Sequence, residues 1–128
     1  MIGMNENDIA KIAVDCCYQT HIALGPGLLE SVYEEVLAHF LHKNGLRFQR
    51  QKQIDIEVDG MVLSKAFYTD LIVEDKVIIE IKSVEAINPV HQKQLLTYLR
   101  LTEKKLGLLV NFNEAKVKDG ISRIVNNL

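Results

Sequence analysis

Apolar residues recur every three or four positions in two stretches near the start of the chain, which is the spacing of an amphipathic helix. The first stretch covers residues 6 to 23, with Asn5 or Asn7 as its N-cap. Gly25-Pro26-Gly27 ends it, and a second helical stretch runs from Leu28 to Lys43, where Asn44-Gly45 supplies a stop. The pattern therefore predicts a pair of helices.

The period then changes to alternation of apolar and polar residues, which is typical of strands. Phe48, Ile54, Ile56 and Val58 alternate with polar residues, and Asp59-Gly60 is a strong hairpin signal. Two runs rich in β-branched residues follow, at 66 to 73 and 77 to 84. We expect a three-stranded antiparallel meander.

A third helix is predicted by Asn88 as cap and Pro89 at the first helical position, and it extends to about Thr102. The apolar run from 106 to 112 comes after this crossover helix, so it should lie parallel to a meander strand. Residues 121 to 125 form a short element whose type the pattern leaves open. The fold class is α/β (α+β mixed sheet), in the order helix, helix, three antiparallel strands, helix, strand.

Composition adds bounds on size and class. The 128 residues are 48% apolar and 25% charged, which fits a single domain over residues 1 to 128 and excludes collagen-like and disordered chains. The net charge of -2 excludes a strongly basic nucleic-acid binder, but it permits a site that meets phosphate through a bound cation. No apolar run is long enough for a membrane span, and the adjacent Cys16 and Cys17 suit reduced thiols in a cytoplasmic protein.

The most informative feature is charge on a strand that should be buried. Glu80 and Lys82 point to one face, while Val77, Ile79 and Ile81 point to the other. A three-residue loop before this strand gives paired residues an index sum of 150 and places Asp70 opposite Glu80. Two facing carboxylates are unfavourable unless a cation lies between them. A two-residue loop would instead put Asp70 on the other face, and an edge strand often carries Glu and Lys on its solvent side.

Two helical patterns add to this set. Glu30 lies in the first turn of the second helix, with Tyr33 and Glu34 on the same face. Gln94 and Tyr98 lie one turn apart on the third helix. Each pattern has an ordinary structural explanation as a helix-dipole partner or a half-buried pair.

Taken together, Gly27, Glu30 and Tyr33 with the other polar residues resemble the small GxxExxY proteins of the PD-(D/E)XK nuclease superfamily, over nearly the whole chain. The superfamily motif maps onto Asp70 and Glu80-Ile81-Lys82. Gln94 and Tyr98 look like the QxxxY motif of the RecB-like branch. The resemblance implies a restriction-endonuclease-like core.

The resemblance also implies residue roles. Asp70, Glu80 and Glu30 would hold Mg²⁺ or Mn²⁺, and Lys82 would orient the attacking water or steady the phosphate. Gln94, Tyr98 and Tyr33 would bind the substrate. We therefore expect Asp70, Glu80, Lys82 and Glu30 to converge in one concave site, with Gln94 and Tyr98 facing it.

The chain departs from the family pattern in two places. Thr69 stands where the superfamily name implies Pro, and the arginine that members carry shortly before the aspartate is missing. Lys65 could replace it only if the strand bends.

The expected function is a metal-dependent nuclease that hydrolyses phosphodiester bonds, with nucleic acid as partner. The choices between DNA and RNA, and between exonuclease and endonuclease, stay open. Two alternatives remain on the same fold: a nucleic-acid-binding module without turnover, and a protein-interaction subunit, for which a homodimer is one form.

Overall fold

The computed structural model describes residues 3–128, and it contains the expected elements in the expected order. Residues 121–125, whose type was left open, form a fifth strand because they pair with the strand before them. The elements are α1 (Glu6–Leu24), α2 (Glu30–Lys43), β1 (Phe48–Val58), β2 (Met61–Val73), β3 (Val77–Lys82), α3 (Pro89–Thr102), β4 (Leu106–Asn111), a short 3-10 helix η1 (Val117–Gly120) and β5 (Ile121–Val125).

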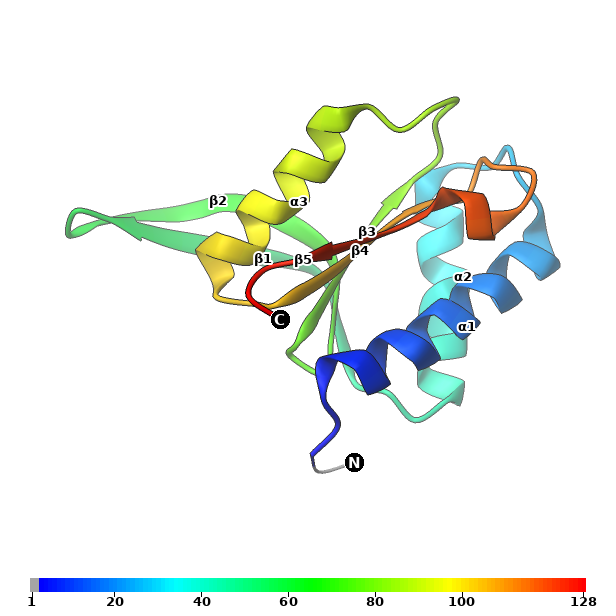
Figure 1. Ribbon diagram of the computed structural model, residues 1–128, viewed down its shortest axis with the longest axis horizontal. Coiled ribbons are helices and arrows are strands. Elements are labelled where there is room, and N and C mark those ends of the chain that lie inside the picture. The colour runs from blue at the N-terminus through cyan, green and yellow to red at the C-terminus, as the bar shows by residue number, and fades with distance from the viewer. Residues whose placement is uncertain (1–2) are drawn as a thin grey trace.

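The strands form one mixed sheet in the order β1-β2-β3-β4-β5 (Figure 1). β3 and β4 are parallel, as expected for strands joined by the crossover helix α3, and the other neighbours are antiparallel. Asp59 and Gly60 form the β1–β2 turn with φ values of 51° and 78°. Both residues tolerate this left-handed region, which a two-residue hairpin turn requires.

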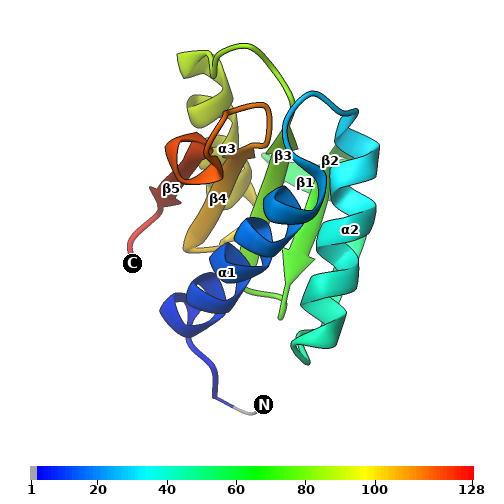
Figure 2. The same ribbon diagram turned by 90° about the vertical axis from the view of Figure 1, so that its right-hand side faces the viewer.

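Helices cover both faces of the sheet (Figure 2). α1 and α2 pack on one face over the larger core, which includes Tyr33, Leu37 and Phe112. α3 covers the other face through Leu95 and Leu99, which are completely buried and which were expected to turn towards the sheet. The result is three layers, with the sheet in the middle.

Side chains of β3 divide between the two cores as strand alternation requires. Val77, Ile79 and Ile81 enter the α1–α2 core, and Ile78 enters the α3 core. On β4, Gly107 lies directly beneath α3, where an added Cβ would approach Leu95 Cδ2 to 2.9 Å. The lack of a side chain there lets α3 lie close to the sheet.

The helix ends follow local chemistry. Asn5 and Asn88 cap α1 and α3 through their side chains, as expected. α2 begins at Glu30 rather than at Leu28, because Leu29 has an extended backbone (ψ 149°) and serves as the N-cap, and the Leu28 N–H donates to the Tyr33 hydroxyl. Within residues 3–128, no helix is both long enough and apolar enough to cross a membrane.

The β1–β2 hairpin extends beyond the rest of the sheet (Figure 1). β3 pairs only with residues Leu71 to Val73 of β2, so the earlier part of β2 has β1 as its neighbour. The β1–β2 register also shifts between Ile54 and Ile56, where Lys65 has a φ of 54°. Asp70 lies where β2 leaves β3.

Candidate functional site

Asp70 occupies the point where β2 and β3 separate. The three-residue loop gives the expected index sum of 150, and the paired residues run from Val73 and Val77 to Leu71 and Ile79. The next pair would be Asp70 with Glu80, but the regular pairing stops before it. Instead, Asp70 Oδ2 accepts a hydrogen bond of 2.8 Å from the backbone N–H of Ile81. The carboxylate therefore bridges the two strands at the place where their backbones part.

Glu80 is the most perturbed acid of the described chain. Its side chain is buried with 8% exposed, and Oε1 has no hydrogen-bond partner. Burial raises the pKa of Glu80 to about 9, the negative charge of Asp70 adds to this rise, and the charge of Lys82 opposes it. The Glu80 carboxyl group is therefore protonated at neutral pH when no cation is bound. A buried oxygen without a partner is the kind of atom that a cation can satisfy.

Lys82 ends β3 and is half-buried. By strand alternation it shares the face of Glu80, as expected, and its charge lowers the pKa of that residue. Asp70, Glu80 and Lys82 therefore form one electrostatically coupled group, as the spacing of the motif predicts. These three residues come from only two neighbouring strands.

A hollow of about 290 Å³ opens beside Asp70, between α2 and the sheet. It is lined by Glu30, Ser31, Glu34, Gln51, Asp70 and Ile81. Three of these six residues are acidic, so the hollow favours a cation over an anion. Glu80 and Lys82 lie on the other face of β3 from Ile81 and do not line this hollow. The expected convergence of Asp70, Glu80, Lys82 and Glu30 in one concave site is therefore not found in this hollow.

Glu30 lines this hollow, but it does not lie in a ready-made cluster with the other acids. Its Oε2 accepts a 3.3 Å hydrogen bond from the backbone N–H of Ser83, just after β3. Among residues 3–128, no three His, Cys, Asp or Glu side chains are grouped closely enough to hold a metal ion. The expected convergence of Asp70, Glu80 and Glu30 on one ion is therefore not preformed. Glu30 instead joins the start of α2 to the end of β3.

Gln51 links α2 to Asp70. Its Nε2 donates to Glu34 Oε1 at 2.6 Å and to Asp70 Oδ1 at 3.2 Å. Gln51 lies across from Asp70, between the paired residues Arg50–Leu71 and Lys52–Thr69, and its φ of 47° is left-handed. An unusual backbone conformation at a non-glycine residue needs support from its surroundings, and here the side chain has two carboxylate partners.

Glu34 and Arg50 complete this network. Arg50 Nε donates to Glu34 Oε2 at 3.0 Å, and Arg50 Nη2 donates to Glu35 Oε1 at 2.9 Å. Glu34 is buried with 8% exposed, and its two carboxylate oxygens accept from Arg50 and from Gln51. Helical spacing in the sequence places Glu34 on the face of Glu30 but indicates no role for it, and no pattern in the sequence points to Gln51 or Arg50. The only local signal was the one-turn spacing of Glu30 and Glu34.

On the α3 side, Tyr98 lies close to Asp70 and Glu80. Its ring stacks on Phe67 with centroids 4.0 Å apart. Burial raises the pKa of Tyr98, and the charges of Glu80 and then Asp70 raise it further. Tyr98 therefore faces the site, as expected, whereas Gln94 is exposed one turn earlier.

Tyr33 was expected to bind substrate, and its position corrects this expectation. The side chain is completely buried and stacks on Phe112, with centroids 4.6 Å apart. Its hydroxyl donates to Gly25 O at 2.6 Å and accepts from the Leu28 N–H at 3.1 Å. A residue without exposed surface cannot touch a substrate, so Tyr33 holds the α1–α2 connection in place.

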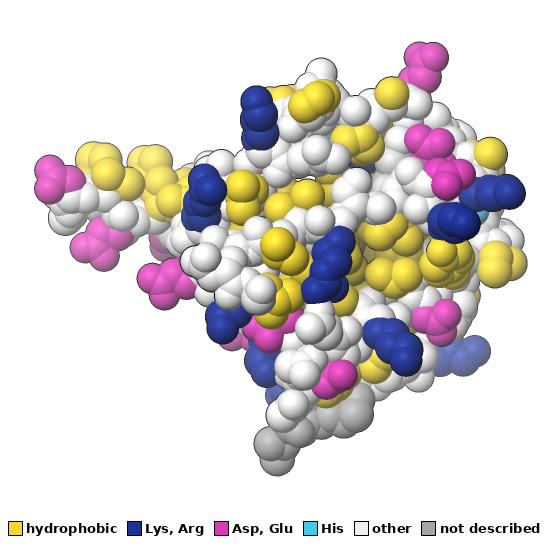
Figure 3. All heavy atoms as spheres, viewed as in Figure 1, with side chains coloured by type: hydrophobic (Ala, Val, Ile, Leu, Met, Phe, Trp, Pro, Cys, Tyr) yellow, Lys and Arg dark blue, Asp and Glu magenta, His cyan; other side chains and the backbone are white. Residues whose placement is uncertain are grey.

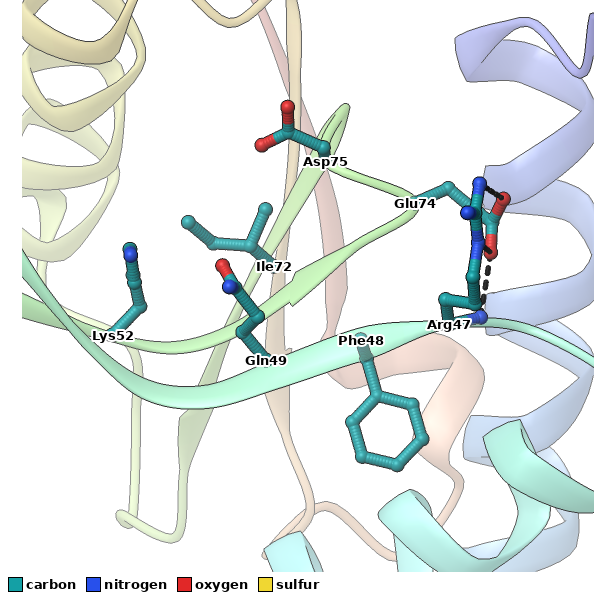
Figure 4. Close-up of a pocket in the computed structure, with 7 residues that line it drawn as sticks. All are labelled: Arg47, Phe48, Gln49, Lys52, Ile72, Glu74 and Asp75. Carbon is teal, nitrogen blue, oxygen red and sulfur yellow. Dashed lines mark hydrogen bonds and ion pairs between the residues drawn. The ribbon is translucent and has the colours of Figure 1, made fainter.

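Another hollow, of about 570 Å³, lies at the start of β1, near the β2–β3 turn (Figure 4). Figure 4 shows Arg47 turned towards Glu74, which accepts hydrogen bonds from the Arg47 backbone N–H at 2.5 Å and from Nη2 at 3.3 Å. Phe48 points away from Gln49 in the same view. Arg47 and Glu74 pair with each other here and join the start of β1 to the β2–β3 turn.

The donor set beside Asp70 fits a magnesium or manganese ion. Such ions are bound through one or two carboxylates, with water and substrate phosphate completing the shell. Asp70 and Glu80 supply two carboxylates, and Glu80 Oε1 has no other partner. A cation bound there would also offset the burial and the Asp70 charge, which together raise the pKa of Glu80. The buried thiols of Cys16 and Cys17 belong to the α1–α2 core and take no part.

Comparison with known proteins agrees with the fold. The crystal structure of SSO0001 is similar to this chain, with a TM-score of 0.57 and 22% sequence identity, over 96% of this chain and 60% of that chain. At this identity the likeness concerns the fold alone, and this chain spans less than two thirds of the length of that protein. Comparison with curated proteins finds no match. The sequence matches the PD-(D/E)XK nuclease superfamily over residues 7–124, nearly its full length, and the protein therefore belongs to that superfamily.

Proposed function

We propose that this protein is a Mg²⁺-dependent nuclease that hydrolyses phosphodiester bonds of nucleic acid. The observation that carries the proposal is the electrostatic coupling of Asp70, at the opening of two strands, to the buried Glu80, whose Oε1 lacks a hydrogen-bond partner. Two carboxylates held in unfavourable proximity are suited to share a cation. Manganese has the same ligand preference and is the second candidate.

Each residue then has a role that follows from its position. Asp70 and Glu80 would hold the ion, which when bound polarises the phosphate and lowers the pKa of water. The Lys82 ammonium, on the face of Glu80, would orient the attacking water or steady the phosphate. Glu30 lines the hollow and would contact the ion through a water molecule.

Substrate contacts would come from α3. Tyr98 lies beside the acidic pair and presents an aromatic ring on which a base or sugar can pack. Gln94 is exposed one turn away and can donate a hydrogen bond to the nucleic acid. These two residues support placing the protein in the RecB-like branch. The Gly27, Glu30 and Tyr33 pattern supports the GxxExxY subfamily.

We place the active unit in residues 1–128 as one nuclease domain. Its two cysteines are free and buried, which suits a reducing compartment such as the cytoplasm. A second copy of the chain is a further candidate partner, because the β1–β2 hairpin exposes apolar side chains.

A non-catalytic binding or interaction module on the same fold is the second candidate. It is favoured by one observation: both oxygens of Asp70 already accept hydrogen bonds, from Ile81 N–H and from Gln51 Nε2. A carboxylate that is satisfied in this way can serve as part of a structural network.

The decisive experiment combines ion binding with cleavage. Wild-type protein and Glu80→Gln are incubated with labelled single-stranded and double-stranded DNA and RNA, without metal and with Mg²⁺ or Mn²⁺. Cleavage that requires the ion and is lost in Glu80→Gln would support the nuclease. Glu57→Gln is the matched control, because Glu57 is an exposed β1 carboxylate near the far end of the hairpin.

Thermal unfolding distinguishes the remaining outcomes. A stabilising response to Mg²⁺ without cleavage of any substrate would favour the binding module. No response to either ion, together with no cleavage, would contradict both the metal site and the nuclease.

A further inference from the structure

Asn111 is the last residue of β4, and its side chain is completely buried. In the parallel register of β3 and β4 it lies beside Lys82, the last residue of β3. Strand alternation puts both side chains on the face of the sheet that α3 covers. Ile78, four residues before Lys82, and Leu109, two residues before Asn111, both enter the α3 core. A buried amide therefore stands next to the lysine of the candidate site.

The Asn111 side chain holds the backbone that follows Lys82. Its Nδ2 donates to Val84 O at 2.9 Å, and its Oδ1 accepts from the Val84 N–H at 3.1 Å. A primary amide has a donor and an acceptor side by side, as a peptide group does, so it pairs with Val84 as a neighbouring strand would. One step earlier, the Phe112 N–H donates to Lys82 O at 2.9 Å. Asn111 thereby extends the β3–β4 pairing two residues past the end of β3.

Other residues fix Asn111 in its place. Its Oδ1 also accepts from the Asn113 N–H at 3.2 Å, and Asn113 Nδ2 donates to Val84 O at 3.2 Å. On the backbone side, Gly120 lies so close that an added Cβ would come within 2.2 Å of Asn111 O. Val84 is therefore bound to a partner that is itself closely packed.

The start of α2 holds the same segment. Ser83 Oγ donates to Leu28 O at 2.6 Å, and the Ser83 N–H donates to Glu30 Oε2 at 3.3 Å. The hydrogen-bonded backbone atoms at the end of β3 are then Lys82 O, Ser83 N, Val84 N and Val84 O. This segment joins the lysine of the candidate site to the helix that carries Glu30.

The placement of Lys82 matters because its positive charge acts directly on Glu80. On the face that Figure 3 shows, the described Lys and Arg side chains lie singly among acidic ones and form no continuous patch. A phosphate would therefore depend on individual cations there rather than on a broad basic surface. A lysine side chain is long and flexible, so its ammonium is held in place only as well as its backbone is.

We propose that Asn111 is a positioning residue for Lys82: by holding the backbone at Val84, it sets where the Lys82 ammonium meets the phosphate or the attacking water. This inference rests on the proposed nuclease function. Because Asn111 has no exposed surface, it touches neither ion nor substrate and acts through the β3 backbone. None of its hydrogen bonds involves Asp70 or Glu80, so ion binding should not depend on it.

Steady-state cleavage of labelled nucleic acid tests this role, with rates expressed per folded molecule as measured by circular dichroism. Asn111→Ala should lower kcat about 10-fold to 100-fold, the effect of a small misplacement of a reacting group. KM and the rise in melting temperature with Mg²⁺ should stay as in wild type. Asn126→Ala is the matched control, because it removes a similar bond, from Asn126 Nδ2 to Lys104 O, beyond the opposite end of β4.

A double-mutant cycle shows whether Asn111 acts through Lys82. In Lys82→Ala, which has already lost the ammonium, adding Asn111→Ala should lower kcat by less than about twofold. Asn113→Ala is a milder variant that removes only the second donor to Val84 O, and it decides the question if Asn111→Ala does not fold. It should lower kcat about threefold, the size of one neutral hydrogen bond, and only when Lys82 is present.

The inference fails if wild type cleaves nucleic acid and Asn111→Ala keeps the same kcat. It also fails if the losses from Asn111→Ala and Lys82→Ala multiply in the double variant, or if Asn126→Ala loses as much kcat at an equal loss of thermal stability. These outcomes leave the nuclease itself standing, because each requires an active wild type. A wild-type protein that cleaves no substrate would contradict the proposed function, and the role of Asn111 with it.

Discussion

Asp70 Oδ2 accepts the backbone N–H of Ile81, the residue that directly follows Glu80, at 2.8 Å. This bond replaces the backbone pairing that the two strands give up at this point, because the last regular pair is Leu71 with Ile79. The same side chain therefore closes the end of the ladder and brings a negative charge to Glu80. A structural bond and a candidate metal ligand coincide in one carboxylate.

Replacing Asp70 should separate these two roles. Asp70→Asn keeps an oxygen that can accept the Ile81 N–H but removes the charge. Ion-dependent cleavage should fall about 100-fold or more, since a lost metal ligand removes several kcal/mol of transition-state stabilisation. The rise in melting temperature with Mg²⁺ should also disappear, as measured by differential scanning fluorimetry. The metal-free variant should be no less stable than wild type, and a marked loss of metal-free stability would favour a structural network.

Glu80 should make stability depend on pH. Its pKa is about 9 in the folded protein, against 4.5 as the ordinary value, so between these limits the folded state holds a proton that the unfolded state has lost. The contribution of Glu80 to the free energy of unfolding is therefore fully present below about pH 4.5. It declines as the pH rises towards 9, by up to about 1.4 kcal/mol per pH unit.

Glu80→Gln should remove this dependence. Urea unfolding of both proteins without metal should show that wild type loses stability relative to Glu80→Gln from pH 5 to pH 8. Other titrating groups cancel in this difference. A constant difference over the range would mean that Glu80 titrates normally.

Gln51 should position Asp70 through its two hydrogen bonds, to Glu34 and to Asp70 itself. Gln51→Ala should weaken Mg²⁺ binding about 10-fold to 100-fold, the usual effect of removing a group that orients a metal ligand. Isothermal titration calorimetry measures the change. Gln53→Ala, two residues along the same strand and exposed, should bind as wild type does. Equal affinities for all three proteins would show that Asp70 needs no such support.

Tyr33 should contribute to stability and leave ion binding unchanged. Tyr33→Phe keeps the ring stacked on Phe112 but removes the bonds to Gly25 O and from Leu28 N–H. The free energy of unfolding should fall by about 1–3 kcal/mol, because two backbone groups lose a partner. Tyr18→Phe changes an exposed hydroxyl and should have little effect. If Tyr33→Phe instead lost Mg²⁺ binding with unchanged stability, Tyr33 would belong to the ion site and not to the core.

Much of the architecture was predictable from the sequence because it depends on short-range geometry. Strand alternation determined that Glu80 and Lys82 share a face, and the three-residue loop determined the register of β2 and β3. The Asn88 cap and Pro89 determined where α3 begins. Each of these relations involves residues close together along the chain, and so each leaves a local pattern.

Only the tertiary structure decided how the site is completed. The Gln51 bridge joins residues from α2 and β2, and it needs the left-handed backbone at Gln51, for which no glycine or turn signal stands in the sequence. Tyr33 shares a face with residues that line the hollow, yet its ring lies in the core because Phe112, far along the chain, packs on it. The sequence pattern was sufficient to identify Asp70, Glu80 and Lys82 as candidate site residues. The hydrogen bonds that support Asp70, and the bond that ties Glu30 to the Ser83 N–H, come from contacts between distant segments, which follow from packing rather than from local spacing.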